Sequence, residues 1–222
     1  MGDGAGGGGV EVMPEVMTRD SVIQALETAA SQASAGEQDG ALTLPWSRED
    51  ALLEFWRDCG YKKIMEIGVE RGRYSKKILQ AIPGSVWCGV DPWKAYRGYR
   101  EHVTQEKLDA FYLETVARLH PFHDGRRVYP MRMDSVEATR FFADGELDVV
   151  YIDGNHTLPY VMADLQAWVP KVRPGGMVCG HDYGRRRVGH VKEAVQAWTA
   201  AYDITPWFLF TADRSWSWGF VK

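Results

Sequence analysis

The chain has 222 residues, of which 45% are hydrophobic and 25% are charged, a composition typical of a globular protein with a substantial core. Its formal net charge of −4 argues against a general nucleic-acid binder, because such proteins are usually basic. No apolar stretch approaches the roughly 18 residues that a membrane-spanning helix needs. Neither nucleic acid nor membrane is therefore expected as a partner.

Signals for export are missing from the sequence. The amino terminus has neither the basic start nor the apolar stretch of a secretory signal. The three cysteines, Cys59, Cys88 and Cys179, are odd in number and lack metal-binding spacing. We therefore expect a cytoplasmic protein with inert, buried thiols.

The first 43 residues differ in composition from the rest. Residues 2–9 contain six glycines and cannot bury apolar surface. We expect residues 1–43 to be a flexible, glycine-rich tail with a short helix over about residues 21–30, and residues 44–222 to form the folded domain.

Helix-like and strand-like stretches alternate within residues 44–222. Ser47 resembles a helix N-cap, and Gly60 is placed to end that first helix. Strands are predicted at residues 62–68, 85–91, 127–134, 147–153 and 174–180, and helices at 75–82, 104–119, 135–143, 157–169 and 191–198. Residues 206–210 and 215–222 are predicted to form an antiparallel hairpin. The alternation predicts an α/β fold with a doubly wound, mainly parallel sheet that binds ligands at the carboxyl ends of its strands.

The first predicted strand runs into a glycine turn, IMEIGVERGRYS. The dinucleotide fingerprint G-x-G-x-x-G fails here, because Glu70 and Arg73 stand where its second and third glycines belong, and no phosphate-binding GK[ST] follows. What remains is Glu66, Gly68 and Gly72, an E-x-G-x-x-x-G pattern. Glycine allows close approach of a ligand, and the acid can accept a hydrogen bond from a cationic amine. The turn predicts a nucleoside with a charged amino-acid tail and no phosphates.

Acidic residues also end the next three predicted strands. Asp91 follows the second strand, where a carboxylate can accept both hydroxyls of a ribose. Asp134 and Ser135 follow the third strand, where a carboxylate and a backbone N–H can bind an adenine. Asp153 ends the fourth strand, at the centre of the sheet. Four acids at successive strand ends indicate a ligand site rather than caps.

With these motifs, the chain resembles the class I S-adenosylmethionine (SAM)-dependent methyltransferases from about Trp46 to its end, and it is most similar to the small-molecule O-methyltransferase-like group with IDGNH and GHDY segments. The resemblance implies a seven-stranded, Rossmann-like sheet whose last strand is antiparallel. It also implies that Glu66, Gly68 and Gly72 hold the methionine part of SAM, Asp91 the ribose, and Asp134 with Ser135 the adenine. Trp93 either lies against the purine or packs in the core. Asp153 is expected to contact the cofactor as well.

Two short segments, YIDGNH and GHDY, are expected to face each other beside the methyl group. In one interpretation, Asp153, Asp182 and His181 bind a divalent cation such as Mg²⁺ that lowers the pKa of the acceptor hydroxyl. In the other, His156 or His181 is a metal-free general base. Both interpretations make Asp153, His156 and His181 candidate catalytic residues.

The function that these features favour is SAM-dependent O-methylation of a hydroxyl on a small molecule, such as a sugar or secondary metabolite. The alternative from another class is a nucleoside-binding module without catalysis that acts through partners. The histidine and aspartate residues favour the enzyme, because a binder needs no titratable pair beside the methyl group. The sequence leaves open the acceptor, the metal requirement and the formation of a homo-oligomer.

Overall fold

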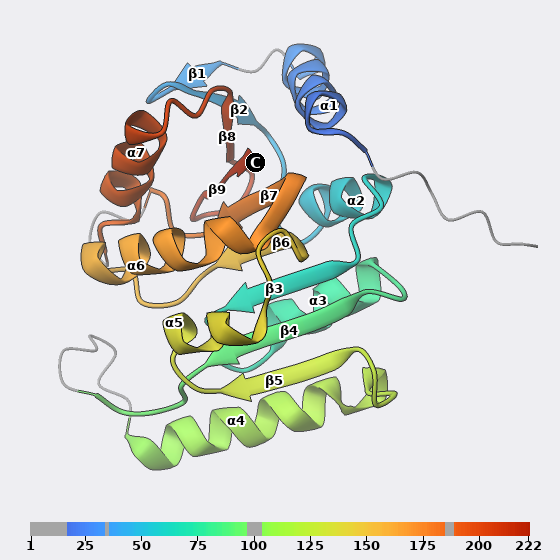
Figure 1. The fold of residues 1–222 in the computed structure, drawn as a ribbon, viewed down its shortest axis with the longest axis vertical. Helices are drawn as coiled ribbons and strands as arrows, with labels where there is room; N and C mark the ends of the chain where they lie inside the picture. Colours follow the sequence, from blue (N-terminus) through green and yellow to red (C-terminus); the bar gives the residue numbers. More distant parts are fainter. Residues whose placement is uncertain (1–16, 34–35, 97–103, 185–188) are drawn as a thin grey trace, which may run out of the picture.

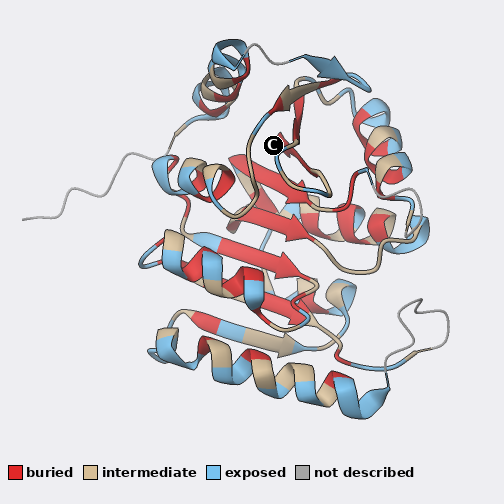
Figure 2. Cartoon of the chain, turned by 180° about the vertical axis from the view of Figure 1, so that it is seen from behind, coloured by how far each residue is buried: buried red, intermediate tan, exposed pale blue. Residues whose placement is uncertain are grey.

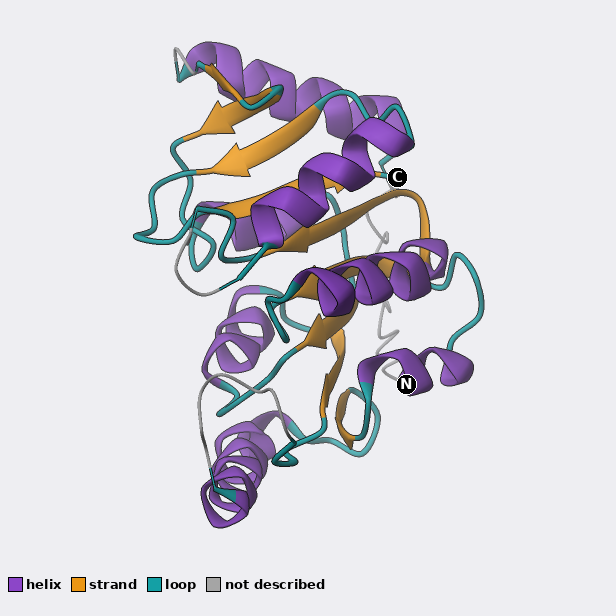
Figure 3. Cartoon of the chain, turned by 90° about the vertical axis from the view of Figure 1, so that its left-hand side faces the viewer, coloured by secondary structure: helices purple, strands orange, loops and turns teal. Residues whose placement is uncertain are grey.

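The computed structural model describes residues 17–33, 36–96, 104–184 and 189–222. These residues form one sheet of nine strands in the order β1-β2-β8-β9-β7-β6-β3-β4-β5. Helices cover both faces of the sheet, so the molecule has three layers (Figures 1 and 3). No helix in the described part of the chain is long and apolar enough to cross a membrane.

The parallel part of the sheet alternates strands with helices, as the sequence predicts. The elements in chain order are β3 (Lys63–Ile67), α3 (Arg73–Ala81), β4 (Val86–Asp91), α4 (Gln105–Leu119), η1 (His120–Phe122), β5 (Val128–Arg132), α5 (Ser135–Ala138), η2 (Thr139–Phe141), β6 (Leu147–Ile152), α6 (Leu158–Trp168), η3 (Val169–Lys171) and β7 (Val172–Gly180). Strands β5, β4, β3, β6 and β7 are parallel neighbours. Their carboxyl ends therefore lie along one edge of the sheet.

The carboxyl-terminal hairpin is also confirmed. After α7 (Val191–Ala201), the antiparallel strands β8 (Trp207–Phe210) and β9 (Ser217–Val221) close this side of the sheet. Strand β9 inserts between β8 and β7 and is antiparallel to both.

The sheet has two more strands than the seven expected. Strand β2 (Ala41–Leu44) pairs in parallel with β8, and the two-residue β1 (Glu37–Gln38) pairs with β2. Helix α1 (Arg19–Gln32) precedes them, and its Val22, Leu26 and Ala30 are buried. Ordered structure thus crosses the expected boundary at residue 44, because α1 has one apolar face and β2 has apolar ends. Residues 1–16 and 34–35 of the expected tail lie outside the described residues.

Helix α2 (Ala51–Asp58) ends as the sequence predicts, with Gly60 in the left-handed conformation at φ 73°. The hydroxyl of Ser47 accepts hydrogen bonds from the N–H groups of Glu49 and Asp50, so it caps the turn just before the helix. Trp46 packs over Phe55 of the helix and stacks on Phe210 of β8.

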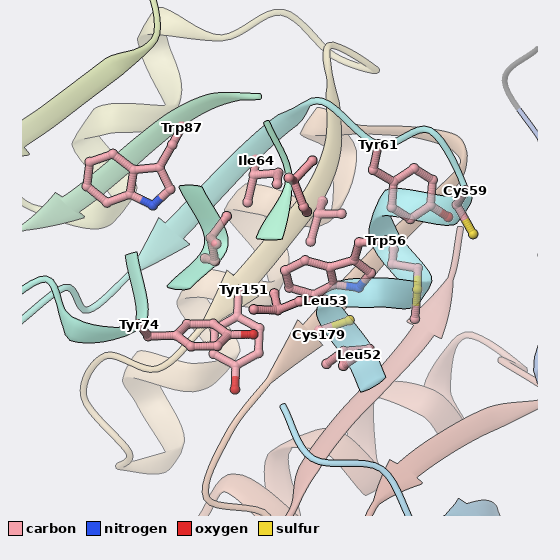
Figure 4. Packing of buried hydrophobic residues seen from close by; sticks show 14 of the residues in the cluster. Leu52, Leu53, Trp56, Cys59, Tyr61, Ile64, Tyr74, Trp87, Tyr151 and Cys179 are labelled. Atoms are coloured by element: carbon pink, nitrogen blue, oxygen red, sulfur yellow. The ribbon is translucent and has the colours of Figure 1, made fainter. Parts of the chain in front are cut away.

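Two apolar clusters, one on each face, hold the layers together (Figure 2). The first joins α1, α2, α3 and α4 to the sheet, and Figure 4 shows its centre, where Trp56, Tyr74 and Tyr151 meet Cys179. The second lies under α5, α6 and α7. Three free thiols are described, and burial raises the pKa of Cys59 to about 12 and of Cys88 to about 11, consistent with inert thiols.

Candidate active site

A cavity of about 740 Å³ opens along the carboxyl ends of β3, β4, β5 and β6. It has the size of sites that bind small molecules and cofactors. Six of the predicted site residues line it: Gly68, Asp91, Trp93, Asp134, Ser135 and Asp153. The lining in the described part of the chain does not include Glu66 or Gly72.

The two predicted glycines serve backbone geometry. Gly68 has φ 86°, and a Cβ there would lie 2.1 Å from the carbonyl oxygen of Asp153, which only glycine tolerates. Gly72 has φ 66° and is the N-cap residue of α3. Glu70, which stands where the dinucleotide fingerprint has its second glycine, also has positive φ, at 52°. The turn is therefore formed without that glycine, and Gly68 brings the backbone of β3 against the end of β6.

Glu66 points away from the cavity, into the core beneath α3. Its Oε2 accepts hydrogen bonds from the Ser75 hydroxyl at 2.7 Å and from the Trp87 indole at 2.9 Å. Burial raises the pKa of Glu66 to about 8, although these two hydrogen bonds oppose the rise. Both hydrogen-bond partners of Glu66 are thus buried side chains. Its contact with the methionine part of a ligand stays a prediction.

Asp91 is placed where a ribose acceptor is expected. Its Oδ1 accepts from the Trp93 N–H at 2.8 Å and its Oδ2 from the Glu70 N–H at 3.0 Å, and the backbone of Val69 also donates to this carboxyl. Trp93 is 1% exposed, donates its indole N–H to the Glu70 carbonyl and packs edge-on against Tyr112. Trp93 therefore packs in the core and forms one wall of the cavity, and its contact with a purine stays a prediction.

Asp134 has a second task at the end of β5. Its Oδ1 accepts from the N–H groups of Val136, at 2.9 Å, and Glu137, at 3.3 Å, and so caps α5. The neighbouring Ser135 donates its hydroxyl to Asp164 of α6, a buried carboxyl that also lines the cavity. The adenine role of Asp134 and Ser135 stays a prediction.

Asp153 links the cavity to a cluster of charged groups. Its Oδ2 forms an ion pair with the Arg48 guanidinium at 2.8 Å. Its Oδ1 lies 3.3 Å from Nε2 of His156 and 3.8 Å from Nδ1 of His181. Burial opposes ionisation of Asp153, but the hydrogen bond from His156 and the charges of His181 and Arg48 hold its pKa below its usual value. Asp153 is therefore ionised at neutral pH.

The remaining cluster members come from β6 and β7, as the sequence predicts. Nε2 of His156 lies 3.3 Å from Oδ2 of Asp182, and Nδ1 of His181 lies 3.4 Å from its Oδ1. Asp182 is 5% exposed at its side chain, has φ 59°, and accepts a 2.5 Å hydrogen bond from the Ser215 hydroxyl. Non-glycine residues held at positive φ concentrate at functional sites.

Histidine protonation in the cluster follows from burial. Burial lowers the pKa of His181. The charges of Asp153 and Asp182 oppose this decrease, and the positive charge of Arg48 adds to it. His181 is thus predominantly neutral at pH 7, the state that can accept a proton or bind a metal ion.

A divalent cation fits these side chains. Asp153, His181 and Asp182 each offer one ligand atom, and these atoms lie within 4.8 Å of one another. Carboxylate oxygens suit Mg²⁺, and an imidazole nitrogen suits Mn²⁺ or Zn²⁺. SAM fits the neighbouring cavity, because a carboxylate at Asp91 and the glycine turn at Gly68 line it.

Three contributors to the site were missed from the sequence: Arg48, Asp164 and Ser215. Arg48 lies in the segment between β2 and α2, outside every strand predicted from the sequence; its guanidinium stacks over the Tyr74 ring at 5.0 Å, and its backbone N–H donates to Asp213. Asp164 is an acid within a mainly apolar stretch of α6, and such a position indicates a buried carboxyl with a hydrogen-bond partner. Nothing in the sequence points to Ser215.

Comparison with known proteins agrees with this geometry. A family model described as a methyltransferase domain matches residues 65–183, more than half of the chain. The chain belongs to this methyltransferase family. Together with the fold, the match makes it a class I SAM-dependent methyltransferase, as the motifs predict.

Solved methyltransferases share the fold at low sequence identity. An O-methyltransferase from Bacillus cereus in complex with S-adenosylhomocysteine (SAH) has TM-score 0.59 and 14% identity. The match covers 96% of this chain and 94% of that chain. The O-methyltransferase NovP has TM-score 0.56 and 18% identity, covering 90% and 97%. CalS11, a TDP-rhamnose 3′-O-methyltransferase, has TM-score 0.53 and 19% identity, covering 78% and 76%.

A curated relative is the uncharacterized protein y4gI of Sinorhizobium fredii, which is 27% identical over 135 residues. The alignment covers 58% of this methyltransferase but 14% of the relative. The chain thus spans about one seventh of the length of that relative.

Proposed function

We propose that this methyltransferase transfers the methyl group of SAM to a hydroxyl of a small molecule. The observation that carries the proposal is the position of Asp153, which lines the cavity and also joins the cluster of His156, His181 and Asp182. A sulfonium methyl needs little activation, whereas a hydroxyl acceptor must lose a proton. A cluster of ionisable groups beside the cofactor cavity meets that requirement. NovP and CalS11 are named as O-methyltransferases, which agrees with an oxygen acceptor.

We further propose that Asp153, His181 and Asp182 hold a divalent cation. Such a cation would supply positive charge that lowers the pKa of the acceptor hydroxyl. Within the protein, Asp153 would present one oxygen to the cluster while Arg48 holds the other at 2.8 Å. The hydrogen bond from Ser215 fixes Asp182 in its orientation. The walls of the cavity, with Trp93 among them, would exclude water from the reacting atoms.

A metal-free mechanism is favoured by a different observation. Nε2 of His156 lies 3.3 Å from both carboxylates, Asp153 and Asp182, so the chain itself places an imidazole nitrogen between them. In this case the neutral imidazole of His181 takes the proton from the hydroxyl that is methylated, and the two carboxylates stabilise the imidazolium that forms.

Labelled methyl transfer from SAM to a panel of phenols, catechols and sugars tests the proposal, with the methylated atom identified by NMR. Methylation of nitrogen or carbon alone would contradict the oxygen acceptor. If a cation is used, chelation abolishes turnover and Mg²⁺ or Mn²⁺ restores it. If His181 is the base, chelation has no effect. The rate then rises with pH through the lowered pKa of His181 and is level by neutral pH.

Asp182→Asn tests whether the cluster contributes to turnover separately from cofactor binding in the cavity. We expect it to reduce turnover strongly while SAH affinity stays within about threefold, because Asp182 does not line the cavity. Asp144→Asn is the matched control, since Asp144 is exposed and pairs with Lys171. An equal loss of SAH binding and turnover would contradict this division.

A further inference from the structure

Asp164 is a buried carboxyl inside the cofactor cavity that the proposed chemistry does not use. It stands on α6 and is 4% exposed. Its Oδ1 accepts the hydroxyl of Ser135, which lines the same cavity. Its Oδ2 lies 3.8 Å from the position that a Cβ on Gly154, another lining residue, would occupy. The carboxyl group is thus oriented by Ser135 and lies in the cavity wall beside the expected adenine position.

The surroundings of Asp164 disfavour its negative charge. The cavity is lined by five other carboxylates, Glu70, Asp91, Asp134, Glu137 and Asp153, and by two cations, Lys94 and Arg132. Arg132 pairs with Asp109 outside this lining. Burial raises the pKa of Asp164 to about 7, Ser135 opposes the rise, and Asp134 adds to it. A large share of Asp164 is therefore a neutral carboxylic acid at physiological pH.

A neutral carboxyl has a capability that a carboxylate lacks. Its O–H donates a hydrogen bond while its carbonyl oxygen accepts one. An adenine edge presents the complementary pair, an amino group that donates beside a ring nitrogen that accepts. Asp134 is less suited to this task, because its Oδ1 already accepts two backbone N–H groups at the start of α5.

We propose that Asp164, oriented by Ser135, reads the adenine edge of the cofactor as a neutral carboxylic acid, so that cofactor affinity falls as the pH rises above neutrality. The inference rests on the cavity being the site of the SAM adenosine. It makes Asp164 a residue that sets cofactor specificity, in addition to the groups at the strand ends.

The sign of the pH effect follows from linkage. Because the ligand binds the protonated form, binding is strongest below the pKa of free Asp164 and weakens as that group ionises. Calorimetric titration of the full chain with SAH at pH 6, 7, 8 and 8.5 should show the dissociation constant rising about 30-fold across this range, because the protonated fraction of a group with a pKa of about 7 falls by roughly that factor.

Two substitutions at position 164 distinguish recognition from packing. Asp164→Asn keeps a donor and an acceptor that cannot ionise, so SAH affinity should stay within about threefold of the wild type at pH 6 and be level up to pH 8.5. Asp164→Leu should weaken binding by about 10- to 100-fold relative to the wild type at pH 6, because both hydrogen bonds are lost, and its affinity should be level with pH. Thermal unfolding of each variant checks that it is folded.

Ser135→Ala and Glu106→Gln complete the series. Removing the Ser135 hydroxyl eliminates the hydrogen bond that lowers the pKa of Asp164, so the loss of affinity should begin at higher pH. Glu106 is exposed at the start of α4 and outside the cavity lining, so its replacement removes a negative charge but should keep the wild-type pH profile.

The outcomes are distinguishable. A wild-type affinity that is level with pH, or a profile that Asp164→Asn retains, overturns the role of Asp164 and leaves the methyltransferase assignment intact. Binding of SAH that Asp164→Leu does not weaken has the same meaning. If folded wild-type protein fails to bind SAH at any pH, the assignment of the cavity is overturned, and with it both this inference and the proposed function.

Discussion

The ends of β3, β4 and β5 and the ends of β6 and β7 form two halves of one site with different construction. In the first half, the acids that line the cavity at the ends of β4 and β5 bind backbone N–H groups of their own or a neighbouring turn, as Asp91 does with Glu70 and Trp93. In the second half, Asp153 and Asp182 bind side chains from distant segments, Arg48 and Ser215. The cofactor half is thus fixed by local turns, and the reacting half by ionic contacts across the fold.

The difference has a physical basis. A cofactor of fixed shape needs rigid acceptors, which short turns with hydrogen-bonded N–H groups supply. A reacting hydroxyl needs groups whose charge and orientation respond to one another, which a network of charged side chains in a low dielectric supplies. Substitutions in the two halves should therefore affect binding and turnover separately.

The largest effect is expected at Asp153, which belongs to both halves. Asp153→Asn removes the charge that pairs with Arg48, His156 and His181, and we expect turnover to fall by about 10³-fold, within the range for loss of a charged active-site group. SAH titration and single-turnover methyl transfer measure the two halves in parallel. A turnover within threefold of wild type would remove Asp153 from the reacting half.

Glu66→Gln tests how burial of a charge under the cofactor half affects stability. The folded-state pKa of about 8 exceeds the ordinary 4.5, so the folded protein holds this proton more tightly, and stability falls as the pH rises from about 4.5 to 8. The variant retains the acceptor for Ser75 and Trp87 but cannot ionise.

We expect the free energy of unfolding of Glu66→Gln, relative to wild type, to rise by on the order of 3 kcal/mol between pH 5 and pH 8. Chemical unfolding at both pH values measures this change. Glu27→Gln is the control, because Glu27 is exposed on α1. A difference that does not change with pH would mean that Glu66 is ionised in the folded protein.

Asp91→Ala tests the cofactor half alone. Loss of a charged acceptor for the ribose hydroxyls should weaken SAH binding by about 1.5–3 kcal/mol, with little effect on turnover at saturating SAM. Asp91→Asn should retain part of the affinity, because its amide oxygen still accepts one backbone N–H. Unaltered affinity in the folded Ala variant would exclude the ribose contact.

The smallest effect is expected for Arg48→Lys. Lysine keeps the positive charge near Asp153 but cannot also stack over Tyr74 and reach Tyr151 with a planar group. We expect turnover to fall about tenfold, as for loss of one orienting contact, with SAH affinity unchanged. If cofactor binding falls instead, Arg48 belongs to the cofactor half, and the comparison between the two halves must be redrawn.

Much of the fold was predictable because its signals are local. Each parallel strand is an apolar run followed by a turn residue and a helix, and the acids at the strand ends identify the binding edge. Residues such as Asp153 and Asp182 were predicted to meet because parallel strands end together, and their ligand atoms do lie within 4.8 Å with those of His181. The strand count differed, with nine strands in place of seven.

The parts that escaped prediction depend on non-local contacts. Strand β2 gains its partner from β8, as in the pairing of Leu42 with Phe208, which no local pattern indicates. Arg48 reaches Asp153 through the packing of the segment before α2. The orientation of Glu66 depends on Gly89, whose missing side chain lets the Trp87 ring fold across β4 toward Glu66.

The insertion of β9 between β7 and β8 has a consequence for protein synthesis. Residues 217–221 leave the ribosome after all the other strands, yet they fill an interior position of the sheet. Until then, the apolar edge of β7 stays open on the nascent chain, and β2 and β8 have no connection to the rest of the sheet. The cofactor half, built from β3, β4 and β5, can fold first, whereas Ser215 reaches Asp182 only in the last step of assembly. The reacting half is thus completed only when β9, the last of the nine strands in chain order, closes the sheet.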